Sequence, residues 1–367
     1  MSTVKEITPQ ELYQKFLSGE HPNLVDVRNP TKFGEWNIFT SNNLPYSKIM
    51  ALEDEKDFPF KNGGGPVITV CTRGNDSKIL AGKLQDIGIE AISLKGGIRE
   101  WNNVMNIVKM PSSSDAEIYQ FQRIAKGCLS YVVVNKDEAY IIDPAYNVEP
   151  YLQFLKEHNL TLTKIFETHL HADHVAGGRF LAEKLGAKLY LPEHDPFQFD
   201  FTAVKNNDSF DLGQEKIKAI YTPGHTKGST SYKIGDVLLV GDTIFADGIG
   251  RPDLADKAPE FAKYLYNTIN NVILQDSTDY LIGPAHHGAI GLDHLKSPID
   301  IKKSEISKYD QLKYDESTFI EYAVNSANKT KKPDSYATIA KINAGVLDLK
   351  EFDAMDLETG PNRCALG

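Results

Sequence analysis

The sequence Thr-His-Leu-His-Ala-Asp-His at residues 168–174 follows a short β-prone segment and contains three histidines and one aspartate. Side chains two positions apart in an extended segment point to the same side, so His169 and His171 can converge on one point. Asp173 and His174 follow where the chain turns, and they can reach a neighbouring point from another direction. Imidazole and carboxylate groups bind transition metals, and this concentration of them argues against a solvated polar loop. The stretch therefore predicts a metal site at the end of a strand.

Three later segments present histidine or aspartate in the same way, each directly after a β-prone run. Together they supply His225, Asp242 and the pair His286 and His287. A single histidine after a strand is more often structural than functional. Because four separate strand ends each present His or Asp, the pattern favours a metal centre assembled from distant parts of a sheet.

The composition is typical of a globular protein with about two domains, since 367 residues are too many for one ordinary core. No stretch approaches the roughly 20 apolar residues of a membrane helix, and the N-terminus does not resemble a signal peptide. A net charge of −10 argues against nucleic acid or an anionic membrane as a partner. Cys71, Cys128 and Cys364 show no zinc-ribbon or disulfide spacing, so a cytoplasmic, reduced protein is expected.

The first hundred residues alternate between strand and helix patterns, which predicts a small parallel α/β sheet. Cys71 ends an apolar run, and the loop behind it leads into a helical pattern. A thiol in this place faces the N–H groups of a helix N-terminus, which favour a thiolate and would hold the terminal sulfur of a persulfide. Arg73 adds positive charge, and Gly74 lets the loop curl. A buried structural cysteine is the alternative.

The loop Cys-Thr-Arg-Gly-Asn-Asp-Ser at residues 71–77 resembles the active site of the rhodanese (sulfurtransferase) family. A related cysteine phosphatase would need an arginine at position 77, where this chain has Ser77. The resemblance extends over roughly residues 1–105 and implies that Cys71 is the catalytic, persulfide-carrying residue, with Arg73 beside it. The flanking segments that agree with the family are Asp26 to Arg28, Glu35 to Ile38 and Leu94 to Trp101.

A polar joint with a proline, residues 110–115, leads into a region rich in β-branched residues. Two strand patterns at residues 129–134 and 138–143 flank a short turn and predict a hairpin. An amphipathic helix is predicted from Val148 to Leu160. The expected organisation is a rhodanese-like domain at residues 1–108, a linker at residues 109–115, and a second domain with a helical C-terminal extension at residues 116–367.

The series of histidines and aspartates resembles the metallo-β-lactamase superfamily over roughly residues 116–300. That resemblance implies a four-layer αβ/βα sandwich with the metal at the edges of its sheets. It also implies two metal positions, with Asp242 able to serve either of them. The first position would be lined by His169, His171 and His225, and the second by Asp173, His174 and His286.

Two branches of this superfamily fit the ligand series. Hydrolases such as glyoxalase II cleave thioesters with two metals and an activated water. Persulfide dioxygenases use one ferrous iron held by two histidines and one carboxylate, which would here be His169, His225 and Asp242. The sequence Gly-Arg-Pro-Asp that contains Arg251 and Asp253 is similar to a segment of the dioxygenases and of their rhodanese-fused relatives. Both residues are therefore expected to shape the substrate pocket, with a structural salt bridge as the alternative.

The predicted protein is a two-domain sulfur-oxidising enzyme with one Fe(II) per chain. A low-molecular-weight persulfide, such as glutathione persulfide, would be oxidised by O₂ to sulfite at the iron. Cys71 would carry sulfane sulfur and exchange it with sulfite and thiosulfate. Two alternatives stay open: a glyoxalase II-like thioester hydrolase with two Zn²⁺ ions, and a sulfur-relay protein that oxidises nothing. Related enzymes are often dimers or tetramers, so a homo-oligomer is expected.

The region beyond residue 299 is helix-prone and charged, and residues 336–349 are expected to pack back on the second domain. Cys364 is expected to be a plain tail cysteine, with a second sulfur acceptor as the alternative. Cys128 stands at a predicted strand start and is expected to belong to the core.

Overall fold

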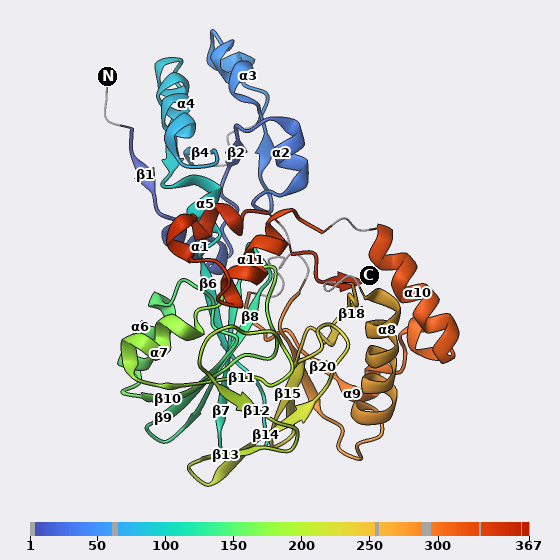
Figure 1. The fold of residues 1–367 in the computed structure, drawn as a ribbon. Helices are drawn as coiled ribbons and strands as arrows, with labels where there is room; N and C mark the ends of the chain where they lie inside the picture. The colour runs from blue at the N-terminus through green and yellow to red at the C-terminus, as the bar shows by residue number, and fades with distance from the viewer. Residues whose placement is uncertain are drawn as a thin grey trace.

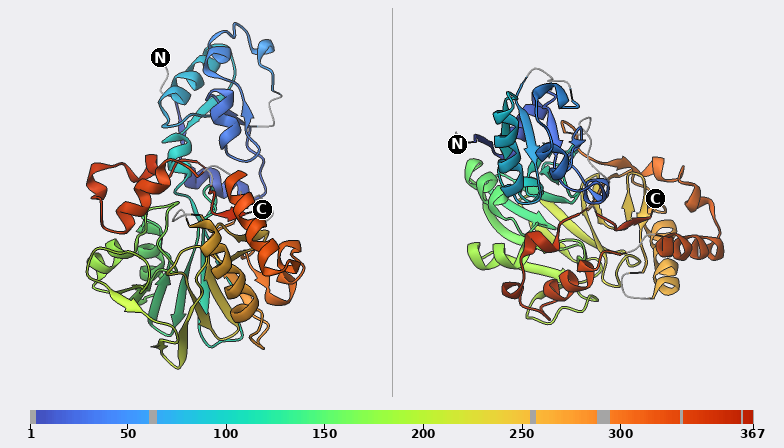
Figure 2. Two further views of the ribbon diagram at one scale, coloured as in Figure 1. Left: turned by 45° about the vertical axis from the view of Figure 1, so that its right-hand side comes forward. Right: turned by 90° about the horizontal axis from the view of Figure 1, so that it is seen from above.

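The computed structural model of the chain describes residues 4–60, 65–253, 257–287, 295–329, 332–360 and 362–366. It consists of a small N-terminal α/β domain stacked on a larger sandwich (Figures 1 and 2). Segments of the C-terminal region, drawn in red, lie where the two bodies meet. Among the described residues, no helix is long and apolar enough to cross a membrane.

The N-terminal domain is built on a five-stranded parallel sheet with the order β1-β5-β4-β2-β3. Its central strand β4 is buried along its whole length, as a parallel sheet covered by helices on both faces requires. This architecture confirms the predicted α/β fold. The strands are β1 (Glu6–Ile7), β2 (Leu24–Asp26), β3 (Asn42–Asn43), β4 (Val67–Val70) and β5 (Ala91–Leu94), and the helices are α1 (Pro9–Leu17), α2 (Pro30–Glu35), α3 (Tyr46–Met50), α4 (Asn75–Asp86) and α5 (Gly97–Trp101).

Helix α4 begins directly behind the loop that carries Cys71. Its N-cap, Gly74, has a φ of 90°, a left-handed conformation that favours glycine. A Cβ at this position would lie 2.8 Å from the backbone nitrogen of Gly96, so the two loops approach too closely for a side chain. The turn thereby directs the Gly74 N–H at the Cys71 sulfur, 3.1 Å away.

The larger domain consists of two sheets packed face to face. Their orders are β12-β11-β10-β9-β8-β7-β6 and β13-β14-β15-β16-β19-β20. Tyr131, Phe166, Tyr232 and Leu239 belong to the apolar core between them. The strands are β6 (Met105–Lys109), β7 (Glu117–Arg123), β8 (Leu129–Asn135), β9 (Glu138–Ile142), β10 (Thr161–Phe166), β11 (Lys188–Pro192), β12 (Thr202–Val204), β13 (Ser209–Leu212), β14 (Glu215–Tyr221), β15 (Thr230–Ile234), β16 (Val237–Gly241), β19 (Leu281–Pro284) and β20 (Ile301–Lys302).

Helices cover the outer face of each sheet and complete a four-layer sandwich (Figure 1). Apolar residues of α6 (Glu149–Glu157) and α7 (Gly178–Leu185) pack on the seven-stranded sheet. Those of α8 (Ala258–Asn267) and α10 (Glu316–Lys329) pack on the six-stranded sheet. Alternate residues of β16 divide between the inner core and this outer layer, as the strand period of two requires. The predicted αβ/βα sandwich is confirmed.

Strand β6 belongs to the sandwich, although the predicted boundary of the first domain lies at residue 108. It pairs with β7 along its whole length in antiparallel register. No proline or glycine stands between α5 and β6, so the composition does not indicate a change of domain there. The polar joint at residues 110–115 instead forms the bend between β6 and β7.

The C-terminal region packs back on the rest of the molecule, as expected (Figure 2). Helix α11 (Ser335–Asn343) packs through Ile339 and Ile342 on Val175, directly behind the loop of residues 168–174. Helix α12 (Ala354–Leu357) lies beside the first domain, where its neighbour Asp353 contacts Arg99. The described residues also form α9 (Lys303–Ile306) and a small sheet of β17 (Ile244–Phe245), β18 (Gly248–Gly250) and β21 (Ala365–Leu366).

Candidate functional site

His169, His225 and Asp242 bring one ligand atom each to a single point. The three atoms lie within 4.8 Å of one another, and all three side chains are buried. The Nε2 atoms of His225 and His169 lie 3.3 and 3.7 Å from Asp242 Oδ2. None of these three atoms has a hydrogen-bond partner among the described residues. Because buried polar atoms are seldom left unpaired, the convergence fits a bound metal ion.

Strand ends position the three ligands: His169 follows β10, His225 follows β14 and Asp242 follows β16. Gly241 precedes the aspartate with a φ of 58°. A Cβ at Gly241 would lie 2.6 Å from Thr168 Oγ1, so only glycine lets the turn after β16 approach the loop after β10.

Hydrogen bonds on the far side of each imidazole determine its tautomer. His225 Nδ1 donates to the backbone carbonyl of Arg251 (2.9 Å), which can only accept. His169 Nδ1 donates to Thr168 Oγ1 (2.8 Å), whose hydroxyl in turn donates to Asp143 Oδ2 (2.7 Å). In both rings the proton is therefore on Nδ1, and the Nε2 lone pair faces the shared point.

The ionisation states also suit a metal. Burial lowers the pKa of His225, and burial together with the neighbouring His171 holds the pKa of His169 well below its ordinary value. Burial opposes ionisation of Asp242, but the neighbouring imidazoles of His286, His225 and His169 together outweigh it and lower the pKa of that carboxyl. Neutral imidazoles beside a carboxylate anion are the forms that bind a metal.

His171, predicted to line the first metal position with His169 and His225, lies beside the three-ligand set and directs its Nε2 at two carboxylates. Its Nε2 is 3.0 Å from Asp143 Oδ1 and 3.2 Å from Glu167 Oε2. Burial opposes protonation, but these two carboxylates raise the pKa of His171 well above its ordinary value. Its ring centroid nevertheless lies 4.1 Å from that of His169, and its Nδ1 has no hydrogen-bond partner among the described residues, so a place for His171 at the first metal position stays a prediction.

A second group of donors lies next to the first. Asp173, His174 and His286 gather as predicted for the other metal position, and Cys128 joins them, with one donor atom of each within 4.8 Å of the others. His286 links the two groups, since its Nδ1 lies 2.5 Å from Asp242 Oδ1. The sequence predicted only a core cysteine at position 128. An isolated β-bridge between residues 128 and 286 brings its thiol here, and no local sequence pattern signals that pairing.

Arg251 and Asp253 support the site from behind. The buried Arg251 guanidinium lies 2.6 Å through Nε and 3.0 Å through Nη2 from the two oxygens of Asp253. Its Nη1 donates to the backbone carbonyl of Arg363 (2.8 Å), while its own carbonyl holds His225. The pair forms the salt bridge that was the alternative, one that also holds the C-terminal segment, while its role in shaping a substrate pocket stays a prediction.

The C-terminal segment completes the walls of the site. Asn362 Nδ2 donates to Asp173 Oδ2 (2.7 Å). Cys364, expected to be a plain tail cysteine, is fully buried, and its sulfur lies within 4.8 Å of donor atoms of Asp242 and His286. Burial raises the pKa of the Cys364 thiol well above its ordinary value, so the group is a neutral wall residue.

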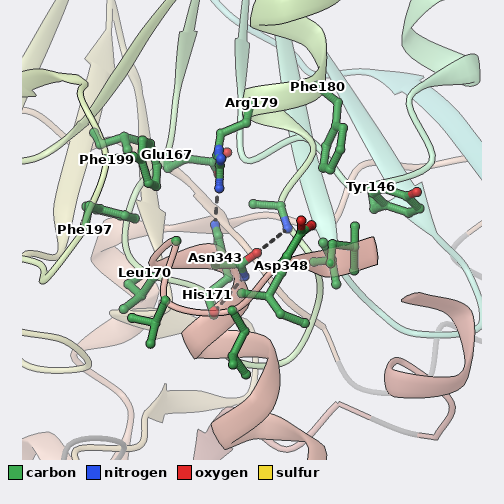
Figure 3. A pocket seen from close by; sticks show the side chains of 18 of the residues that line it. Tyr146, Glu167, Leu170, His171, Arg179, Phe180, Phe197, Phe199, Asn343 and Asp348 are labelled. Atoms are coloured by element: carbon green, nitrogen blue, oxygen red, sulfur yellow. Dashed lines mark hydrogen bonds and ion pairs between the residues drawn. The ribbon is translucent and has the colours of Figure 1, made fainter. Parts of the chain in front are cut away.

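Two cavities among the described residues adjoin the loop of residues 168–174, and Leu170 lines both. The larger, of about 810 Å³, lies between α7 and the segment after α11 and reaches His169 (Figure 3). Its walls carry Arg179 and aromatic side chains such as Phe199. The smaller, of about 500 Å³, reaches His225 and is lined by Lys227 among others. Each cavity therefore adjoins one histidine of the three-ligand set.

Cys71 occupies the predicted place behind β4. Its sulfur accepts hydrogen bonds from the Gly74 N–H (3.1 Å) and the Ser77 hydroxyl (3.3 Å) at the first turn of α4. These donors and the positive end of the helix dipole stabilise negative charge on the sulfur. Arg73 pairs with Asp356 of the C-terminal segment at 2.5 Å. The loop can therefore hold a thiolate or a persulfide anion.

Comparison with protein families identifies one family for each of the two domains. Residues 8–104 match the rhodanese-like domain, and residues 123–286 match the metallo-beta-lactamase superfamily. The chain thus carries an N-terminal rhodanese domain followed by a metallo-beta-lactamase domain.

Among curated proteins, the hydroxyacylglutathione hydrolase of Prochlorococcus marinus is 35% identical over 156 residues, which cover 39% of this chain and 59% of that protein. The hydroxyacylglutathione hydrolase of Brucella ovis is 41% identical over 123 residues, 32% of this chain and 44% of that protein. The chain therefore spans about half the length of these curated relatives.

One similar solved structure is a metallo-beta-lactamase from Staphylococcus aureus subsp. aureus COL. Its TM-score is 0.55 at 29% identity, with 62% of this chain and 72% of that chain covered. ETHE1 from Myxococcus xanthus has a TM-score of 0.53 at 24% identity, with 66% of this chain and 99% of that chain covered, and shares the fold.

Proposed function

We propose that this protein oxidises a low-molecular-weight persulfide, such as glutathione persulfide, with O₂ at a single Fe(II), and that its rhodanese domain transfers sulfane sulfur. The observation that carries the proposal is the set of His169, His225 and Asp242, whose donor atoms form one close group in which His171 is not included. Two histidines and one carboxylate leave metal positions open for other ligands, as in non-haem Fe(II) oxygenases. A dinuclear hydrolase of this superfamily would use His171 as a further ligand.

Ferrous iron held by these residues would supply the redox chemistry between O₂ and sulfur. The net reaction is RSSH + O₂ + H₂O → RSH + SO₃²⁻ + 2H⁺, in which the terminal sulfur is oxidised and O₂ is reduced. The protein contributes the ligand geometry. The carbonyl of Arg251 and the hydroxyl of Thr168 keep the two imidazoles in the binding tautomer, and burial of all three ligands limits access of bulk water.

The organic part of the persulfide is assigned to the cavity that adjoins His225. Its volume of about 500 Å³ falls within the range of small-molecule sites. Exposed Lys227 lines this cavity, and its ammonium group complements a carboxylate on a peptide-like thiol carrier.

The rhodanese domain would transfer sulfane sulfur from Cys71 to the sulfite that forms at the iron. In the step Cys71–SSH + SO₃²⁻ → Cys71–SH + S₂O₃²⁻, the outer sulfur forms a bond to sulfite as the bond to the Cys71 sulfur breaks. The Gly74 N–H and the Ser77 hydroxyl would stabilise the departing thiolate.

Anaerobic purification, metal analysis and an oxygen electrode test the proposal. The expected result is one iron per chain and O₂ uptake with glutathione persulfide that yields sulfite. The second candidate is a zinc thioester hydrolase, favoured by the names of the curated relatives. It would show two zinc ions per chain and cleave S-lactoylglutathione without O₂. A protein that contains neither metal and transfers sulfur only would contradict both.

A further inference from the structure

Cys128 is held against the second donor group by the backbone on both sides. It stands immediately before β8, and its β-bridge partner is His286, which follows β19. Two flanking hydrogen bonds, Leu129 N–H to the Ala285 carbonyl (2.7 Å) and His287 N–H to the Gly127 carbonyl (2.9 Å), secure this register. The thiol is therefore part of the sheet framework and not of a mobile loop.

The donors around Cys128 face a common point. Its sulfur lies 3.3 Å from Asp173 Oδ2, and all four donor side chains of the group are buried, with Cys128 the most exposed at 5%. The Nε2 atoms of His174 and His286 have no hydrogen-bond partner among the described residues. His286 Nε2 nevertheless lies 2.8 Å from Asp173 Oδ2, a close contact without hydrogen-bond geometry. Such contacts are typical of neighbouring ligands that surround one cation.

We propose that Cys128 is the fourth protein ligand of a closed Zn²⁺ site formed with Asp173, His174 and His286. Sulfur, imidazole and carboxylate donors that converge in four-fold coordination are the set Zn²⁺ prefers. The first position, by contrast, has only nitrogen and oxygen donors in the three-ligand set. A thiolate in the second group therefore makes the two positions chemically unequal, and the softer donor draws Zn²⁺ to the second.

The thiolate also determines what the second metal can do. Four protein ligands close a tetrahedral site, whereas a hydrolytic zinc keeps one position for water. Asn362 Nδ2, 2.7 Å from Asp173 Oδ2, holds that carboxylate from outside, as supporting hydrogen bonds around metal ligands do. Zinc in this site is thus structural, and it binds whether or not the first position performs the proposed oxidation.

Cobalt substitution tests the assignment through a spectrum and not through activity. The metal-free full-length protein is titrated with Co²⁺ under anaerobic conditions, because a thiolate bound to Co²⁺ gives a sulfur-to-metal charge-transfer band in the near ultraviolet. We expect the band in the parent protein and its loss in Cys128→Ser. The matched controls Cys71→Ser and Cys364→Ser are expected to keep it, and the second of these tests the other thiol close to His286.

Metal analysis of the same variants separates loss of a ligand from loss of the fold. Cys128→Ser is expected to lose about one zinc per chain while its near-ultraviolet circular dichroism and bound iron match the parent protein. A parent protein without the band overturns the proposal, as does a band that survives in Cys128→Ser or disappears in Cys364→Ser. If Cys128→Ser does not fold, zinc-edge X-ray absorption of the parent decides instead: one zinc–sulfur distance supports the site, and none overturns it.

Discussion

The carboxylate of Asp356 lies 2.5 Å from the guanidinium of Arg73. Arg73 stands two residues after Cys71 in the same loop. Arg99, whose backbone N–H donates to the Thr72 carbonyl of the same loop, pairs with Asp353. Asn362, further along the same C-terminal segment, contacts Asp173 of the second donor group. One stretch of chain therefore contacts both candidate sites.

Asp356→Asn is expected to increase sulfur transfer from anionic donors. The carboxylate competes with thiosulfate for Arg73, and exposed ion pairs of this kind contribute about 0.2–1 kcal/mol. The kcat/KM for thiosulfate should rise by up to about fivefold, and added salt should shrink the difference. Glu316→Gln removes a similarly exposed pair with Lys263 and should change nothing. Equal kcat/KM values at low salt would show that Asp356 does not compete.

Cys71→Ser is expected to abolish thiosulfate formation and to leave O₂ uptake with glutathione persulfide intact. The reason is that Cys71 directly follows β4 in the first domain, while the three-ligand set belongs to the sandwich. An oxygen electrode and a thiosulfate assay on the same preparation measure the two activities. Loss of O₂ uptake in a folded variant would mean that the two sites do not work independently.

His225→Gln and His171→Gln are expected to differ in bound iron. The first removes a member of the three-ligand set, whereas the second alters a residue whose Nε2 faces Asp143 and Glu167. Iron per chain after anaerobic purification should fall to near zero in His225→Gln and stay close to the parent value in His171→Gln. His171→Gln should instead lower the melting temperature, because it leaves two buried carboxylates without their cation. Loss of iron from both variants would restore His171 as a ligand.

Glu358→Gln is expected to destabilise the fold. Glu358 Oε2 lies 2.6 Å from Arg123 Nη1 with both side chains almost fully buried, and its Oε1 accepts the Val175 N–H. Breaking a buried pair by neutralising one partner costs about 3–5 kcal/mol. Chemical denaturation should show this loss in the free energy of unfolding, whereas Glu117→Gln, which breaks the exposed pair with Lys109, should cost less than about 1 kcal/mol. Similar losses in the two variants would argue against a special role of burial.

Much of the fold and of the ligand series can be predicted from the sequence, because runs of apolar or β-branched residues mark where strands end. His169, His225 and Asp242 each follow an apolar or β-branched run, and sheet edges bring such positions together. The contact of His171 with Asp143 does not follow from the sequence, because the two residues come from separate segments of the chain. Nor does the role of Cys128, whose neighbour His286 is set by a pairing between strands that are distant in the chain.

The role of Arg251 is a further feature that the sequence alone does not determine. The sequence indicates an arginine close to an aspartate, and the ion pair with Asp253 is present. Whether such a pair faces a substrate or the interior depends on the segments that cover it. Here the C-terminal segment does so, and its residue Arg363 accepts a hydrogen bond from the guanidinium.

The position of strand β6 restricts where the two domains can be joined by recombination. It follows the first domain without a break, yet it forms the outermost row of the seven-stranded sheet. If the two domains were separated after residue 108, most of β6 would be lost from the sheet. The backbone N–H and C=O groups of β7 that pair with β6 would then be unpaired, and such an exposed strand edge is where proteins associate. Any recombination that replaces the rhodanese domain must therefore cross over before Met105 and leave β6 with the sandwich.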